Sequence, residues 1–127
     1  MRIVKSAAFA ALLVVAGTIA ALGHAKLTAS VPNDGASVAP PVSAIELTFS
    51  KPLRLTLVKV VRGSDQQHMP LTGELPKTVG KSVRTAVSPL QADSYKVSWT
   101  AVAEDGHVMK GSFAFSVNEA GGALAKP

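Results

Sequence analysis

The 127-residue sequence contains no cysteine, which excludes disulfide bridges, thiolate metal sites, iron–sulfur clusters and cysteine nucleophiles. Aromatic residues make up only 5% of the chain and charged residues only 17%. The apolar fraction of 47% is nevertheless high enough for a folded chain, and this length allows one domain. Any imidazole chemistry rests on three histidines, His24, His68 and His107.

Residues 1–23 have the layout of a secretory signal peptide. A short basic segment with Arg2 and Lys5 precedes an apolar run that extends from residue 7 to about residue 22 and ends in small residues. The run is shorter than the roughly 20 residues that a membrane-spanning helix needs, so we expect cleavage rather than a retained anchor. We expect the cut before His24, with a cut after Ala25 as the alternative.

Cleavage changes the charge balance of the chain. Loss of Arg2 and Lys5 lowers the Lys+Arg count from 13 to 11 against 8 Asp+Glu, so the net charge falls from +5 to +3. The remaining basic residues are scattered singly along the sequence, without a Lys/Arg run or interleaved aromatic residues. The sequence therefore gives little support for nucleic-acid binding, and its charge balance does not point to an anionic partner.

The mature chain is predicted to be all-β. Alternating apolar and polar residues, separated by turn residues and prolines, are typical of short half-buried strands. The predicted strands are 27–31, 45–50, 55–61, 82–87, 95–102 and 111–117. No segment after residue 24 has a convincing helical period, so we expect a small antiparallel β sandwich or barrel of the immunoglobulin-like kind. Residues 24–118 form the predicted domain, and residues 119–127 a flexible tail.

The turn candidate Glu104-Asp105-Gly106-His107 lies between two strong strands. Asp105 and His107 can turn toward one point, because Gly106 relaxes the backbone between them. A carboxylate oxygen beside an imidazole nitrogen suits Cu(II), Ni(II) or Zn(II). Asp-Gly is also a common turn pair, so a hairpin turn without a metal remains the alternative.

His24 gains chemistry if it becomes the first residue of the mature chain. Its α-amine and imidazole could then chelate one metal ion, and an α-amine has a pKa of only about 7.7–8.0. Together with Asp105 and His107 they would make a nitrogen and oxygen set that favours Cu(II). A first residue without any ligand role is the alternative.

His68 and Met69 form a third candidate pair. A thioether beside an imidazole could hold Cu(I), but two ligands do not close a site. The surrounding residues 65–70 are polar and end in proline, so we expect an exposed loop without a ligand role.

Several stretches together resemble the CopC-like periplasmic copper-resistance proteins. The matching stretches cover nearly the whole mature chain and are His24-Ala25-Lys26-Leu27, Ile45-Glu46-Leu47-Thr48-Phe49-Ser50, Ser88-Pro89-Leu90, Tyr95-Lys96-Val97-Ser98-Trp99 and Asp105-Gly106-His107 followed by Gly111-Ser112-Phe113-Ala114-Phe115. The resemblance implies a Greek-key β sandwich or barrel of about seven strands. It also implies one Cu(II) per chain, bound by His24, Asp105 and His107, in a monomeric periplasmic protein that stores or carries copper, often beside an inner-membrane transporter of the CopD type.

The chain departs from the family pattern at two places. Some members have a methionine-rich loop that binds Cu(I), whereas this chain has only His68 and Met69 there. Some members have a glutamate after the Phe-Ser of the second strand, near the Cu(II) site, whereas this chain has Lys51. A lysine that pointed inward would repel copper.

The leading hypothesis is a noncatalytic protein that binds one Cu(II) for resistance, storage or delivery. A second hypothesis is a copper-dependent oxidase, because an N-terminal histidine chelate resembles the histidine brace of lytic polysaccharide monooxygenases. The short chain offers no evident aromatic platform for a polymer, and a carboxylate ligand resists redox cycling. A third hypothesis is a metal-free binding module, since β sandwiches commonly serve in adhesion.

Overall fold

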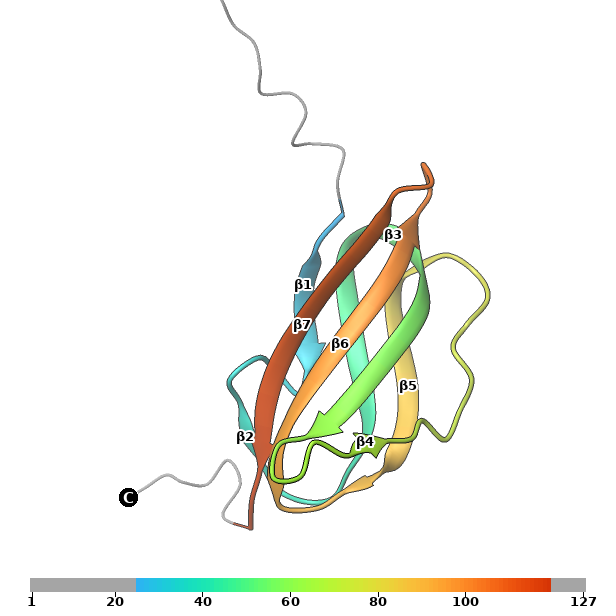
Figure 1. Cartoon of the computed structure of the whole chain (residues 1–127). Coiled ribbons are helices and arrows are strands. Elements are labelled where there is room, and N and C mark those ends of the chain that lie inside the picture. The colour runs from blue at the N-terminus through green and yellow to red at the C-terminus, as the bar shows by residue number, and fades with distance from the viewer. Residues whose placement is uncertain (1–24, 120–127) are drawn as a thin grey trace, which may run out of the picture.

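The computed structural model describes residues 25–119, which form seven β-strands and no helix (Figure 1). The strands are β1 (Leu27–Val31), β2 (Ser37–Val38), β3 (Val42–Arg62), β4 (His68–Met69), β5 (Gly80–Leu90), β6 (Asp93–Ala103) and β7 (Val108–Val117). All pairings are antiparallel except that of β2 with β7. Within this part of the chain no helix could cross a membrane. The predicted all-β sandwich or barrel of about seven strands is confirmed.

Strand β3 belongs to two layers of the fold. Its first part lies between β1 and β5, and its second part lies between β4 and β6. The pairing with β5 shifts register between Thr48 and Leu53, and Pro52 lies inside this shift. Proline has no backbone N–H to donate, so it is tolerated where a ladder is interrupted. The two strands predicted at 45–50 and 55–61 are therefore parts of one long strand that changes partners.

The predicted inward faces of β6 and β7 are buried. Alternate residues along both strands are at most 5% exposed, and they are Tyr95, Val97, Trp99, Ala101, Phe113, Phe115 and Val117. Phe49 of β3 meets Trp99 edge-on, with ring centroids 5.0 Å apart. Such contacts hold the two layers together without disulfides, since hydrophobic burial dominates the stability of a domain of this size.

The prediction of a loop at His68 and Met69 is wrong. The two residues form strand β4, which pairs with Val60 and Val61 at the end of β3. The pairing with β3 holds this segment on the sheet, and Met69 packs against the core. Strand β4 and the β6–β7 turn lie at opposite ends of the molecule (Figure 1). The predicted signal peptide, and all but the first residue of the predicted tail, lie outside the described residues.

Candidate metal centre

Asp105 and His107 lie in the tight turn between β6 and β7. The N–H of Ala103 donates to the carbonyl of His107 at 2.9 Å, and the N–H of Gly106 donates to the carbonyl of Ala103 at 2.9 Å. Gly106 has a φ of 92°, a conformation that side chains with a Cβ rarely adopt. The predicted turn between two strands is therefore confirmed, and Gly106 lets the chain reverse there.

The turn brings the two candidate ligands into direct contact. Nδ1 of His107 lies 2.8 Å from Oδ2 of Asp105, and the backbone N–H of His107 donates to Oδ1 of Asp105 at 3.1 Å. The N–H of His107, and then its ring, hold the pKa of the Asp105 carboxyl below its usual value. About half or more of each side chain is exposed, 53% for Asp105 and 64% for His107. The pair is therefore an ionised carboxylate and an imidazole that a metal ion can reach from solvent.

The chain enters the fold beside this turn. Ala25 is only 2% exposed, and it lines a cavity of about 190 Å³ together with Glu104 and Asp105. Two hydrogen bonds fix the next residue to β3: the N–H of Lys26 donates to Oγ of Ser50 at 3.0 Å, and the N–H of Ser50 donates to the carbonyl of Lys26 at 2.8 Å. The first described residues are thus held at the end of the molecule that carries Asp105.

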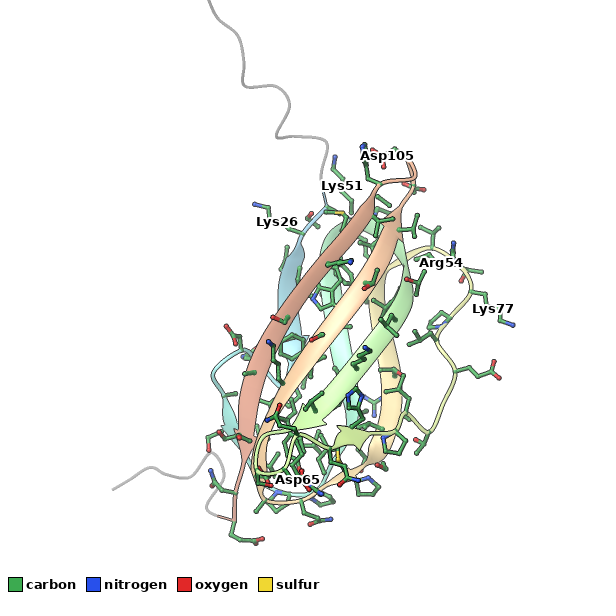
Figure 2. All side chains as sticks on the ribbon, viewed as in Figure 1. Lys26, Lys51, Arg54, Asp65, Lys77 and Asp105 are labelled. Atoms are coloured by element: carbon green, nitrogen blue, oxygen red, sulfur yellow. The ribbon has the colours of Figure 1, made fainter. Side chains whose placement is uncertain are left out.

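Lys51 lines the same cavity as Asp105 and Glu104. It stands next to Pro52, where β3 changes partners, and Figure 2 shows Lys51 and Asp105 at the same end of the molecule. A positive charge at this position attracts the neighbouring carboxylates and repels a metal cation that approaches them. The orientation of Lys51, which the sequence leaves open, is therefore toward the candidate site.

The described residues contain two of the three predicted ligands. His24 lies just outside the described range, which begins at Ala25. Among residues 25–119 no group of three or more His, Asp or Glu side chains could hold a metal ion. Asp105 and His107 alone are too few for a closed site, so a metal centre here requires a further donor.

Sequence reasoning missed the parts of the site that depend on long-range packing. It treated Ala25 only as a possible cleavage position, and it did not decide whether Glu104 faces the site or solvent. The structure places both along one cavity with Asp105. A single alanine such as Ala25 carries no local sequence pattern that would identify it as a core residue.

Sequence comparisons identify relatives along most of the chain. Residues 27–118 match the family model of the CopC domain. The chain is 38% identical to the copper resistance protein C of Pseudomonas syringae pv. tomato over an alignment of 108 residues, which covers 76% of this chain and 82% of that protein. It is 32% identical to the copper resistance protein C of Escherichia coli over an alignment of 126 residues, which covers 92% of this chain and 99% of that protein.

Comparison of structures also identifies similar proteins. The crystal structure of CopC from Methylosinus trichosporium OB3b superimposes with a TM-score of 0.63 at 19% identity, covering 75% of this chain and 94% of that one. PcoC, a methionine-rich copper resistance protein from Escherichia coli, gives a TM-score of 0.57 at 27% identity, covering 76% of this chain and 100% of that one. With the family model matched over most of its length, the chain belongs to the CopC domain family.

Proposed function

We propose that this protein binds copper as part of copper resistance and holds one Cu(II) through the α-amine and imidazole of His24, the carboxylate of Asp105 and the imidazole of His107. Two relatives, each more than 30% identical, are named copper resistance proteins, which supports the copper assignment. The residues that would bind the ion come from two distant parts of the sequence. The fold must therefore bring the start of the mature chain close to the β6–β7 turn.

The observation that carries the proposal is the burial of Ala25 beside Asp105. Ala25 lines one cavity with Asp105, and the hydrogen bonds between Lys26 and Ser50 hold the chain there. Consecutive Cα atoms are about 3.8 Å apart, so the residue before Ala25 is attached next to this cavity. A mature chain that starts at His24 would therefore present its amine and imidazole within reach of the Asp105–His107 pair.

The donor set suits oxidised copper. Two nitrogens from His24, an imidazole nitrogen from His107 and an oxygen from Asp105 form the nitrogen and oxygen environment that Cu(II) prefers. The carboxylate favours Cu(II) over Cu(I), so the protein would hold the ion rather than cycle it, which is why we propose a noncatalytic role. Binding would weaken in acid, because the amine and imidazoles must lose their protons to coordinate.

The proposed location is the periplasm, reached after removal of residues 1–23. The basic and apolar segments of the N-terminus support export, and the absence of cysteine is compatible with an oxidising compartment. There the monomeric domain would store copper or deliver it to an inner-membrane transporter of the CopD type. Both roles use the same site, since each needs one ion held and released.

The decisive experiment moves the α-amine away from the site. One alanine inserted before His24 leaves every side chain in place but removes the amine–imidazole chelate. We expect Cu(II) affinity to fall by more than about tenfold and the visible spectrum to shift, because two of the proposed donors no longer belong to one residue. Mass spectrometry of the exported protein, with and without equimolar Cu(II), measures the cleavage site and the stoichiometry together.

The matched control is His68→Ala, which removes an exposed imidazole at the other end of the molecule. It should leave Cu(II) affinity unchanged. A mature chain that begins at Lys26, or an extended variant with the affinity and spectrum of the parent, would contradict the proposed ligand set. Failure of the parent chain to bind Cu(II) at all would contradict the copper assignment itself.

A further inference from the structure

The outward face of β3, β6 and β7 collects four cations from three strands. The register pairs residues of the second part of β3 with β6 and residues of β6 with β7, which sets them in transverse rows. Four consecutive rows each carry one cation, and in order along the sheet these are Arg54, Lys110, Lys59 and Lys96. Neighbouring rows are two residues apart along a strand, or about 7 Å. All four side chains are exposed, two of them on β3 and one each on β6 and β7, so positive charge is spread over the width of this face.

No carboxylate interrupts these four rows. Their other outward positions carry only aliphatic residues, alanine, serine and threonine. Glu104 and Asp105 lie beyond the first row in the β6–β7 turn, and Asp93 lies three residues before Lys96. The carboxylate of Asp34 accepts a hydrogen bond from the N–H of Ala114 at 3.0 Å, at the β7 edge of the fourth row. The ion pair of Arg84 with Glu46, at 2.6 Å, lies on the β3–β5 pairing and not in these rows. The outward side chains of these rows therefore carry four cations and no carboxylate, with Asp34 at one edge, although the whole chain is only modestly basic.

Two features of the face favour a broad anionic surface as its partner. Leu57 and Val108 are 43% and 61% exposed between the cations, so apolar contact accompanies the charge. At the other end a hollow of about 380 Å³ is lined by Lys96, Ser94 and Ser98 among others, and no acidic residue lines it. The hollow offers one cation and two hydroxyls to an anionic group, as a phosphate would require.

We infer that this basic face, defined by Arg54, Leu57, Lys59, Lys96, Val108 and Lys110, docks the domain on an anionic phospholipid bilayer. Lipid anions move laterally, so they can match cations spread over three strands without a preformed pocket. The aliphatic side chains would rest at the headgroup level. This inference does not depend on the proposed copper site.

Other anionic partners fit the face less well. Tight protein interfaces are anchored by buried aromatic and arginine side chains in pockets, and no aromatic residue points outward from these four rows. Single-stranded nucleic acids need aromatic platforms for base stacking, which the same rows lack. A bilayer requires neither, because its attraction for cations is diffuse and adds up over each lysine or arginine near the surface.

Vesicle sedimentation tests the inference with the exported protein, in the absence of copper. The probes are vesicles of phosphatidylcholine alone and of phosphatidylcholine mixed with phosphatidylglycerol. We expect binding to the anionic vesicles only, with a loss on raising the salt from 0.1 M toward about 1 M, where the Debye length shrinks from about 10 Å to about 3 Å. Each cation near the surface should change the partition constant about fivefold.

The double variant Lys59→Gln/Lys96→Gln should therefore bind anionic vesicles about 25-fold more weakly. Its matched control is Lys77→Gln/Lys81→Gln, which removes the same charge from the segment before β5 and from β5 itself, and which should change binding far less. Circular dichroism checks that both variants fold. If the first pair does not fold, Arg54→Gln/Lys110→Gln carries the same expectation.

Three results would overturn the inference. Equal losses in the two double variants would mean that net charge alone, rather than this face, governs binding. Equal binding to neutral and anionic vesicles would mean that the cations are not used. Absence of binding to anionic vesicles, even at low salt, would leave an acidic protein as the partner to be sought.

Discussion

Nδ1 of His107 lies 2.8 Å from Oδ2 of Asp105, two residues earlier in the same turn. The contact orients the imidazole through a carboxylate whose pKa is held low by the His107 N–H and then by its ring. An ionised partner of this kind fixes the tautomer of a ligating histidine and raises its basicity. In the proposed copper site Asp105 would thus have two roles, as a ligand and as the group that positions His107.

Single substitutions measure the contributions of His107 and Asp105 to copper affinity one at a time. His107→Ala removes a donor nitrogen, and we expect Cu(II) affinity to fall by about 100-fold or more. Asp105→Asn keeps the shape of the side chain but removes the anionic oxygen, and we expect a loss of about 10- to 100-fold. Competition titration against a chelator of known affinity measures both. Parent-like affinity in either variant would remove that residue from the site.

Lys51 should weaken copper binding, because it lines the cavity with Asp105 and Glu104. We expect Lys51→Gln to raise Cu(II) affinity by roughly fivefold at low ionic strength, since one repulsive charge near the ion is removed. The gain should shrink at high salt, where the repulsion is screened. The control is Lys81→Gln, an exposed lysine of β5 that does not line this cavity. An affinity that falls in Lys51→Gln would show instead that Lys51 supports the site.

Gly111 is required by the ring of Trp99, its partner in the β6–β7 pairing. A Cβ at position 111 would meet Cζ2 of Trp99 at 2.6 Å, closer than real contacts allow. Gly111→Ala should therefore cost about 1–3 kcal/mol of unfolding free energy, because the buried indole has to move. Thermal denaturation, followed by Trp99 fluorescence, measures the loss.

Gly73→Ala is the matched control for this substitution. A Cβ there would lie 3.7 Å from the Cβ of Ala86, an ordinary van der Waals contact. Its stability should stay within about 0.5 kcal/mol of the parent. A similar loss in both variants would mean that the contact with the indole ring does not set the cost at position 111.

Asp93 links the stability of the fold to pH. The hydroxyl of Ser64 donates to Oδ2 of Asp93 at 2.5 Å, and this bond, helped by the N–H groups of Ser94 and Ser64, lowers the pKa of the carboxyl below its usual value. A group whose pKa is lower in the folded state stabilises the fold above its unfolded pKa of about 3.9 and loses that effect as the pH falls further. Asp93→Asn should therefore be less stable than the parent at pH 7, and the difference should shrink below about pH 4.

Urea denaturation at several pH values measures this difference. Glu74→Gln, in the segment between β4 and β5, provides a control with the same change of charge and no corresponding hydrogen bond to Ser64. A difference between Asp93→Asn and the parent that stays constant down to pH 2 would show that the ionised carboxylate is not the stabilising form.

The sequence alone predicted the strand character of most of the chain and the turn that carries Asp105 and His107. Period-2 alternation decides which face of β6 and β7 is buried, because successive side chains point to opposite sides of a strand. The Asp-Gly pair predicted the turn that holds Asp105 and His107. Such features depend on neighbouring residues, so local pattern is enough to read them.

Only the tertiary structure decided which residues, far apart in the sequence, lie together on one surface or around one cavity. The second part of β3 pairs with β6, and β6 pairs with β7. These pairings bring to one face basic residues that are scattered singly in the sequence. The net charge of the chain, which pointed to no anionic partner, therefore does not describe this surface. The cavity that joins Ala25, Lys51 and Asp105 likewise depends on the packing of three distant segments. Register and packing are set by the whole core, and a short window of sequence carries no record of them.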